Sequence, residues 1–155
     1  MAEPRYILET DGAVRPGERH MSRDWPSVGG AGIVLWDPAM VPVLVESVHL
    51  GAVSGSTEAE FRAALVGLRR AKDRRIEKLR VRSDCEPVVR HLTGEEPLET
   101  RWALAAQAEL RELLGAFESV EARWTPSSHA LERRAGVPTA DALARKAVGL
   151  ARRRR

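Results

Sequence analysis

Carboxylates stand at four places in the sequence where a strand is expected to end or a helix to begin. Side chains at such positions can converge over one edge of a sheet. A cluster of carboxylates without a counter-charge costs on the order of several kcal/mol, unless a divalent cation neutralises it. Oxygen ligands favour the hard cations Mg²⁺ and Mn²⁺, so the pattern predicts a metal site. The four acids are Asp11, Glu60, Asp84 and Asp141.

Each of these acids, taken singly, also has a structural explanation. An acid in the first turn of a helix stabilises the helix dipole, as Glu60 and Asp141 would. Asp11 directly before Gly12 is typical of a turn. The metal hypothesis therefore depends on all four acids occurring in one chain, each at the end of a predicted element.

Hydrophobic periodicity predicts the elements that would position the acids. Segments that alternate apolar and polar residues indicate strands, and apolar residues every three or four positions indicate helices. Three strands come first and later strands are separated by helices, which predicts a mixed α/β sheet flanked by helices. Strands are expected at 5–10, 32–36, 41–49, 78–82 and 119–124, and helices at 57–72, 85–92, 100–117 and 139–150.

Local signals refine three of these elements. Ser56 or Thr57 is the expected N-cap of the helix 57–72, and Glu60 would complete a capping box with Thr57. Pro42 limits the third strand to a sheet edge or to a start at the proline. The predicted buried faces are Phe61, Ala64, Leu65, Leu68 and Lys72 in the helix 57–72, and Leu104, Ala108, Leu110, Leu113 and Leu114 in the helix 100–117.

Two segments are predicted to be loops, and three single residues have interpretations of their own. The segments 12–30 and 125–138 contain glycine, proline and charged residues and are predicted to be loops. Glu9 shares a strand face with Asp11, so we expect it at the rim of the site or in an ion pair with an arginine. Cys85 and Trp124 are interpreted as core residues.

Length and composition predict one domain, 1–151, followed by a basic tail, 152–155. Without the four tail arginines, 21 basic residues face 22 acidic ones, so the body is nearly neutral. The tail would either contact phosphates or be a solvated chain end. No apolar run approaches the ~20 residues that cross a bilayer, no signal peptide is evident, and the single cysteine suits a reducing compartment. We expect a cytoplasmic, non-membrane monomer.

Six short blocks carry a family resemblance that spans nearly the whole chain. They are TDGA at 10–13, Pro16-Gly17, GGAG at 29–32, AEFRAAL at 59–65, Ser83-Asp84 followed by Val88-Val89, and ADALA at 140–144. In this combination and order they resemble the type 1 ribonuclease H family, in particular its short bacterial branch related to the ribonuclease H domains of reverse transcriptases.

The resemblance implies a ribonuclease H-like fold with a five-stranded mixed sheet and a site for two divalent ions, Mg²⁺ with Mn²⁺ as the alternative. Asp11 would bridge both ions, Asp141 would help hold the ion that activates water, and Glu60 and Asp84 would hold the other. The implied activity is hydrolysis of the RNA strand of an RNA–DNA hybrid, leaving 5′-phosphate and 3′-hydroxyl ends. His129 would shuttle protons or assist product release.

The sequence departs from the family at its expected substrate contacts. It contains no asparagine, whereas the family often has asparagines just before the helical glutamate, where they contact the hybrid in its minor groove. Ser56 and Thr57 stand near there, and hydroxyls and backbone amides can bind ribose 2′-OH groups. The expected substrate-binding residues are Gly12, Ala13, Ser56, Thr57, Arg133 and Arg134.

Three other functions fit the same sequence. One is a catalytically silent nucleic-acid-binding module, although a silent module has no need of four clustered acids. Another is a nuclease that cuts RNA in a wider range of structures, which the missing asparagines leave open. The third is a transposase- or integrase-like DNA nuclease, which usually needs extra DNA-binding domains.

Overall fold

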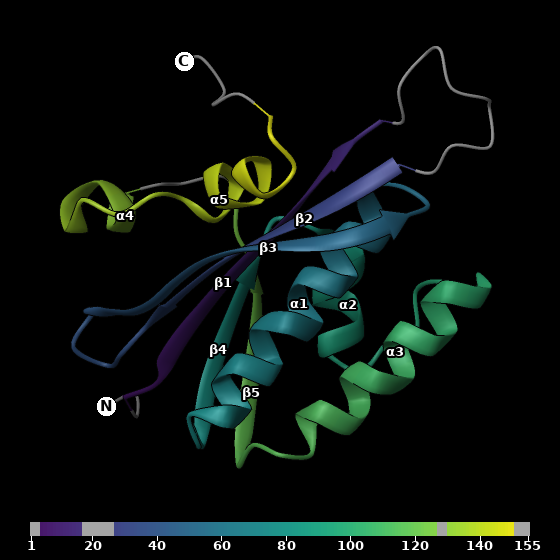
Figure 1. Ribbon diagram of the computed structural model, residues 1–155. Coiled ribbons are helices and arrows are strands. Elements are labelled where there is room, and N and C mark those ends of the chain that lie inside the picture. The colour runs from purple at the N-terminus through teal and green to yellow at the C-terminus, as the bar shows by residue number, and fades with distance from the viewer. Residues whose placement is uncertain (1–3, 17–26, 127–129, 151–155) are drawn as a thin grey trace.

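The computed structural model describes residues 4–16, 27–126 and 130–150. They form a five-stranded sheet with the order β3-β2-β1-β4-β5 (Figure 1). β1 pairs antiparallel with β2 and parallel with β4, so the predicted mixed sheet is confirmed. The strands are β1 (Tyr6–Arg15), β2 (Ser27–Trp36), β3 (Pro42–Val53), β4 (Lys78–Ser83) and β5 (Ser119–Trp124). The helices are α1 (Ser56–Asp73), α2 (Glu86–Leu92), α3 (Arg101–Leu114), α4 (Ala130–Ala135) and α5 (Ala140–Ala147).

The helices cover the two faces of the sheet unequally. α1, α2 and α3 lie on one face and enclose the main core, whereas α4 and α5 lie on the other (Figure 1). Successive residues of a strand point to opposite faces, so Leu8 enters the main core while Ile7 packs with Leu143 of α5. No helix of the described part is long and apolar enough to cross a membrane.

β1 and β2 are longer than predicted, and the predicted loop 12–30 is wrong at both ends. Gly12 pairs with Ala31, and the pairing continues to Arg15 and Val28. Asp11 therefore lies within a strand and not at its end. The glycines of β2 indicated a loop, but they allow α5 to pack closely, because a Cβ at Gly32 would overlap the carbonyl oxygen of Ala140. Residues 17–26 lie outside the described part.

The predicted helix faces are partly wrong. In α1 four of the five predicted residues are buried, but Lys72 is exposed near the C-terminal end. In α3 Leu104 is 50% exposed and Ala108 is also exposed. The buried stripe of α3 includes two alanines, which allow a close approach to α1, and one glutamine whose amide bonds the backbone of Leu98. Its residues are Ala103, Ala106, Gln107, Leu110 and Leu113.

The two helix starts that matter for the site have different caps. Thr139 accepts a hydrogen bond from the amide of Ala142 (3.0 Å), so the predicted start of α5 is confirmed. The predicted capping box of α1 is wrong, because its N-cap is Gly55 without a side-chain bond. Glu58, not Glu60, reaches back and accepts from the amide of Ser54 (3.0 Å). Glu60 instead lies among the acids of the site.

The predicted loop 125–138 contains the helix α4, which the sequence analysis missed. Its Ala-Leu-Glu-Arg composition favours helix, and Gly136 follows it with a positive φ of 69°, as at many helix ends. Six residues are too few for a hydrophobic period to show. Trp124, just before this segment, is 56% exposed, so its interpretation as a core residue is wrong.

Candidate active site

The parallel pairing of β1 and β4 brings two of the predicted acids side by side. The last pair in the register is Glu9 with Arg82, so Asp11 and Asp84 each lie two residues beyond it. β4 ends at Ser83 while β1 continues, and Asp11 therefore lies where its neighbouring strand turns away. Such an opening beyond the carboxyl end of a strand is a common place for a site.

Glycine at position 12 allows the third acid to join them. A Cβ at Gly12 would lie 2.6 Å from the backbone nitrogen of Glu60 and from the carbonyl carbon of Ala59. Real Cβ atoms do not approach backbone so closely, so only glycine lets the first turn of α1 lie directly on β1. Because of this contact, Glu60 lies close to Asp11 and Asp84.

Asp11, Glu60 and Asp84 form one carboxylate cluster. One oxygen from each of them lies within 4.8 Å of the other two. Asp11 is 8% exposed and accepts a hydrogen bond from the amide of Gly12 (3.0 Å), while Asp84 opens to solvent. Oε2 of Glu60 is buried with no hydrogen-bond partner. The cluster thus has a closed inner end and an open outer end.

The electrostatics of the cluster disfavour its charged form. Burial raises the pKa of Asp11 to about 6; a hydrogen bond with Glu60 opposes this shift, and the charges of Asp84 and Asp141 add to it. Burial, followed by the charge of Asp11, raises the pKa of Glu60 to about 11. Buried carboxylates of this kind either keep a proton or gain a cation. The site is therefore able to bind a cation in exchange for protons.

Asp141 approaches the cluster from the opposite face of the sheet. It lies in the first turn of α5, half-buried, and is close enough to Asp11 for its charge to raise the pKa of that group. α5 is fixed to the sheet by a hydrogen bond from Ser47 Oγ to the carbonyl of Leu143 (2.7 Å). Three of the predicted acids thus share one cluster, and the fourth lies within electrostatic reach of it.

The other predicted site residues are spread around this cluster. Ser56 is exposed and Thr57 half-buried in the first turn of α1, and Gly12 lies beneath that turn. The Ala13 side chain is buried in a small core cluster with Ala144 and Val148. Arg133 and Arg134 are exposed on α4. His129 and the tail 152–155 lie outside the described residues.

A second carboxyl pair, which the sequence analysis missed, lies on the same strand as Asp11. Glu9 accepts a hydrogen bond from Trp36 Nε1 (2.6 Å) and is hydrogen-bonded to Glu132, which is 2% exposed on α4. Burial, followed by the contact with Glu132, raises the pKa of Glu9 to about 7, although the charge of Arg82 opposes this shift. Glu9 is therefore a half-buried hydrogen-bonded group. The only signal for its partner was the short helix-forming sequence before Gly136.

Cys85 does not provide a nucleophile. Its thiol is partly buried beside Asp84, and burial raises its pKa to about 11. The charges of Glu60 and Asp84 act in the same direction. A thiol in such surroundings stays protonated and unreactive near neutral pH.

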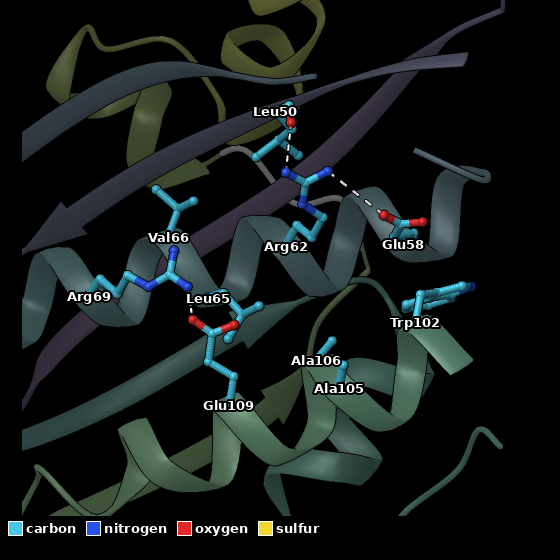
Figure 2. A pocket seen from close by; sticks show the side chains of 10 residues that line it. All are labelled: Leu50, Glu58, Arg62, Leu65, Val66, Arg69, Trp102, Ala105, Ala106 and Glu109. Atoms are coloured by element: carbon cyan, nitrogen blue, oxygen red, sulfur yellow. Dashed lines mark hydrogen bonds and ion pairs between the residues drawn. The ribbon is translucent and has the colours of Figure 1, made fainter. Parts of the chain in front are cut away.

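A cavity of 290 Å³ lies apart from the acids, between α1, α3 and the end of β3 (Figure 2). Arg62 crosses it to bond the carbonyl of Leu50 (2.6 Å) and pairs with Glu58. Arg69 on its far side pairs with Glu109. Since its charged groups bond one another, this cavity offers no group for catalysis.

Comparison with known proteins identifies relatives of the same architecture. A family model described as reverse transcriptase-like matches residues 22–147. No curated protein matches the sequence. Among solved structures, ribonuclease H1 from the halophilic archaeon Halobacterium salinarum NRC-1 superimposes with a TM-score of 0.72 at 26% identity, covering 94% of this chain and 98% of that one.

Two further structures share the fold at lower identity. The N-terminal ribonuclease H domain of rv2228c from Mycobacterium tuberculosis has a TM-score of 0.73 at 22% identity, over 92% of this chain and 97% of that one. LC11 ribonuclease H1, solved in complex with an RNA/DNA hybrid, has a TM-score of 0.73 at 21% identity, over 94% and 97%. The predicted ribonuclease H-like fold is confirmed by these similarities.

Proposed function

Because this chain belongs to the reverse transcriptase-like, ribonuclease H-type family, we propose that it is an endoribonuclease that cuts the RNA strand of RNA–DNA hybrids. The products would carry 5′-phosphate and 3′-hydroxyl ends. The observation that carries the proposal is the convergence of Asp11, Glu60 and Asp84 at the open edge between β1 and β4. The hybrid complex of the similar LC11 enzyme supports the choice of substrate.

The donor set fits divalent cations. It consists of carboxylate oxygens alone, which Mg²⁺ and Mn²⁺ prefer, and it includes a buried Glu60 oxygen with no hydrogen-bond partner. Asp11, Glu60, Asp84 and Asp141 would hold two ions, with Asp11 shared between them. Ions bound there would make water a stronger nucleophile and stabilise the charge that develops on the leaving 3′ oxygen.

The chain's own residues would orient the acids and the substrate. The amide of Gly12 fixes one oxygen of Asp11, and the close contact at Gly12 fixes the first turn of α1. The exposed hydroxyl of Ser56 and that of Thr57 lie in the same turn as Glu60 and could bind a ribose 2′-OH. The backbone at Gly12 and Ala13, and the exposed Arg133 and Arg134, are the remaining proposed contacts. His129 would move protons or assist release of the product.

A wider RNA specificity is the second candidate function. The chain has no asparagine, so the hybrid would be selected by hydroxyl, amide and arginine contacts alone. Such contacts recognise a ribose or a phosphate more readily than the pairing of RNA with DNA. The single-domain organisation, the monomeric state and the cytoplasmic location stay predictions.

The decisive experiment incubates the protein with labelled RNA–DNA hybrid, RNA duplex, DNA duplex or single-stranded RNA in the presence of Mg²⁺ or Mn²⁺ and measures cleavage. Asp11→Asn removes a proposed ligand, and Asp73→Asn makes the same change at the exposed end of α1 as a control. We expect hybrid cleavage that only Asp11→Asn abolishes. Cleavage of several RNA forms would favour the wider specificity, whereas hybrid binding without cleavage under both metals would leave a silent binding module.

A further inference from the structure

The face of β4 and β5 opposite the main core carries arginines close to the cluster of acids. Strand alternation and the register place Arg80 beside Glu121 and Arg82 beside Arg123 on this face. α5 packs against β1, β2 and β3, so it leaves this part of the sheet uncovered (Figure 1). The side chain of Arg123 is 59% exposed and that of Arg80 is 30% exposed.

Among the described residues, the charges that meet at Glu121 do not balance. Glu121 is the shared partner of three arginines, at 2.7 Å from Arg123, 3.3 Å from Arg80 and 3.7 Å from Arg5. One carboxylate can neutralise only one guanidinium, so two positive charges remain in excess. Arg5 is also held by Ser119 Oγ (2.8 Å), whereas Arg80 has a buried Nε with no hydrogen-bond partner. This arrangement is suited to a polyanion and not to a self-sufficient ion-pair network.

The position of the arginines relates them to the acids. Arg82 lies two residues before Asp84 on β4, and Arg80 lies four residues before it. A strand advances about 3.3 Å per residue, so Arg80 is about 13 Å from Asp84 along β4. A nucleic-acid strand advances about 3.4 Å along its axis per nucleotide. Arg80 therefore lies about four nucleotides from a phosphate bound at the cluster of acids, and Arg82, with Arg123 beside it, lies about two.

We propose that Arg80, Arg82 and Arg123 bind the phosphate backbone of the hybrid on one side of the cleavage point. The inference rests on the proposed function, and it assigns substrate affinity to a surface that neither the acids nor α4 provide. Phosphate contacts position a substrate without reading its sequence, so this surface affects affinity and not the chemical step.

The test measures hybrid binding by Arg82→Gln and Arg123→Gln in the Asp11→Asn background, at several salt concentrations. The control is Arg70→Gln, since Arg70 pairs with Glu46 at 2.9 Å but lies ten residues beyond Glu60, about 15 Å along α1. Each of the first two changes should weaken binding several-fold near 0.1 M salt and lower the salt slope by about 1. In the active enzyme KM should rise while kcat stays unchanged. Binding equal to that of the control would overturn the inference.

Glu121→Gln should change hybrid binding in the opposite direction to the arginine variants. If the arginines bind the substrate, removing the carboxylate that Arg5, Arg80 and Arg123 share should tighten hybrid binding and steepen its salt dependence. If the four residues only stabilise the sheet, the same change should lower the melting temperature and leave binding unaltered, which would contradict the inference. Because each outcome has its own readout, a loss of stability cannot be mistaken for a loss of binding.

Substrate length locates the contact. Hybrids shortened from one side to fewer than about two base pairs beyond the cleavage point should lose their sensitivity to Arg123→Gln, while shortening the other side should have no such effect. Equal sensitivity at every length would overturn the placement. If wild-type protein neither binds nor cuts any hybrid, the proposed function itself fails, and that result is distinct from a failure of the arginine variants alone.

Discussion

Two groups of carboxyls are centred on Glu9 and Asp11, two residues apart on β1, and they differ in how their charge is compensated. Glu9 has a hydrogen-bond donor in Trp36, a second carboxyl in Glu132, and the nearby charge of Arg82. Asp11 has the amide of Gly12 and a hydrogen bond with Glu60, and the charges of Asp84 and Asp141 lie near it. The pair at Glu9 is enclosed by Glu132 on α4, whereas the cluster at Asp11 includes a third carboxylate, Asp84, that is exposed to solvent and so gives a cation access to the site.

The comparison shows that burial of acids does not by itself indicate a metal site. Both groups have a raised pKa, because burial disfavours any carboxylate. What distinguishes them is the number of oxygens that converge and the side open to solvent. Asp84 is exposed and links its cluster to solvent, while Glu132 is 2% exposed and closes the other pair under α4.

The largest expected difference is in activity. Asp11→Asn should lower kcat for hybrid cleavage on the order of 10³-fold, because a bridging metal ligand contributes several kcal/mol to the transition state. Glu9→Gln, two residues away on the same face of the strand, should keep kcat within about threefold. Single-turnover assays with excess enzyme measure this contrast. Equal loss in both variants would mean that the pair at Glu9 belongs to the catalytic site.

Metal binding should stabilise the folded protein through the cluster at Asp11 and not through the pair at Glu9. At a metal concentration of about 100 times the dissociation constant, Mg²⁺ or Mn²⁺ would raise the free energy of unfolding by about 2.7 kcal/mol. This corresponds to a rise of roughly 5–10 °C in melting temperature. Glu60→Gln should abolish this shift, and Glu132→Gln should retain it. The shift should be larger at pH 8 than at pH 5, since protons bound by Asp11 and Glu60 compete with the metal. A shift insensitive to Glu60 would place the metal elsewhere.

Without metal, the pH dependence of stability should report the protonation of Glu9 in its pair with Glu132. Glu9 has a folded pKa of about 7 and an unfolded value near 4.5, so the folded state holds the proton more tightly. Its stabilising proton is fully present below pH 4.5, and stability falls as the pH rises through 7. Glu132→Gln removes the neighbouring charge and should reduce this fall by a few degrees in melting temperature.

Asp11 and Glu60 titrate in the same direction as Glu9, so the informative quantity is the difference between the variant and wild-type curves. Urea unfolding at pH 4.5, 6 and 8 measures that difference. Parallel curves at all three pH values would show that Glu132 does not influence the proton on Glu9.

The smallest expected effect involves the two indoles that bond these groups. Trp124 Nε1 donates to the backbone carbonyl of Asp84 (3.2 Å), and Trp124→Phe should lower kcat two- to tenfold, since one hydrogen bond contributes about 0.5–1.5 kcal/mol. Trp36→Phe removes the donor to Glu9 and should lower stability without changing kcat. Thermal melts beside steady-state rates separate the two cases, and the reverse assignment would contradict the comparison.

Much of the site could be predicted because its signals are local. Asp84 follows the alternating segment of β4, and Asp141 follows Thr139, which caps α5 as expected. Glu60 was placed near the correct helix start, although the capping role predicted for it belongs to the backbone and to Glu58. The loop expected after Asp11 was wrong, because glycine propensity was overridden by the packing of α5 against β2.

The sequence by itself determined the acids, the order of strands and helices apart from α4, and the mixed sheet, since hydrophobic periodicity and caps depend on neighbouring residues. Tertiary structure alone decided that Glu9 would meet Glu132, 123 positions away along the chain, and that Trp124 would lie at the surface. It also decided that the carboxylate of Glu121 would pair with three arginines. Burial and charge balance depend on which distant segments pack together, and no local pattern records that.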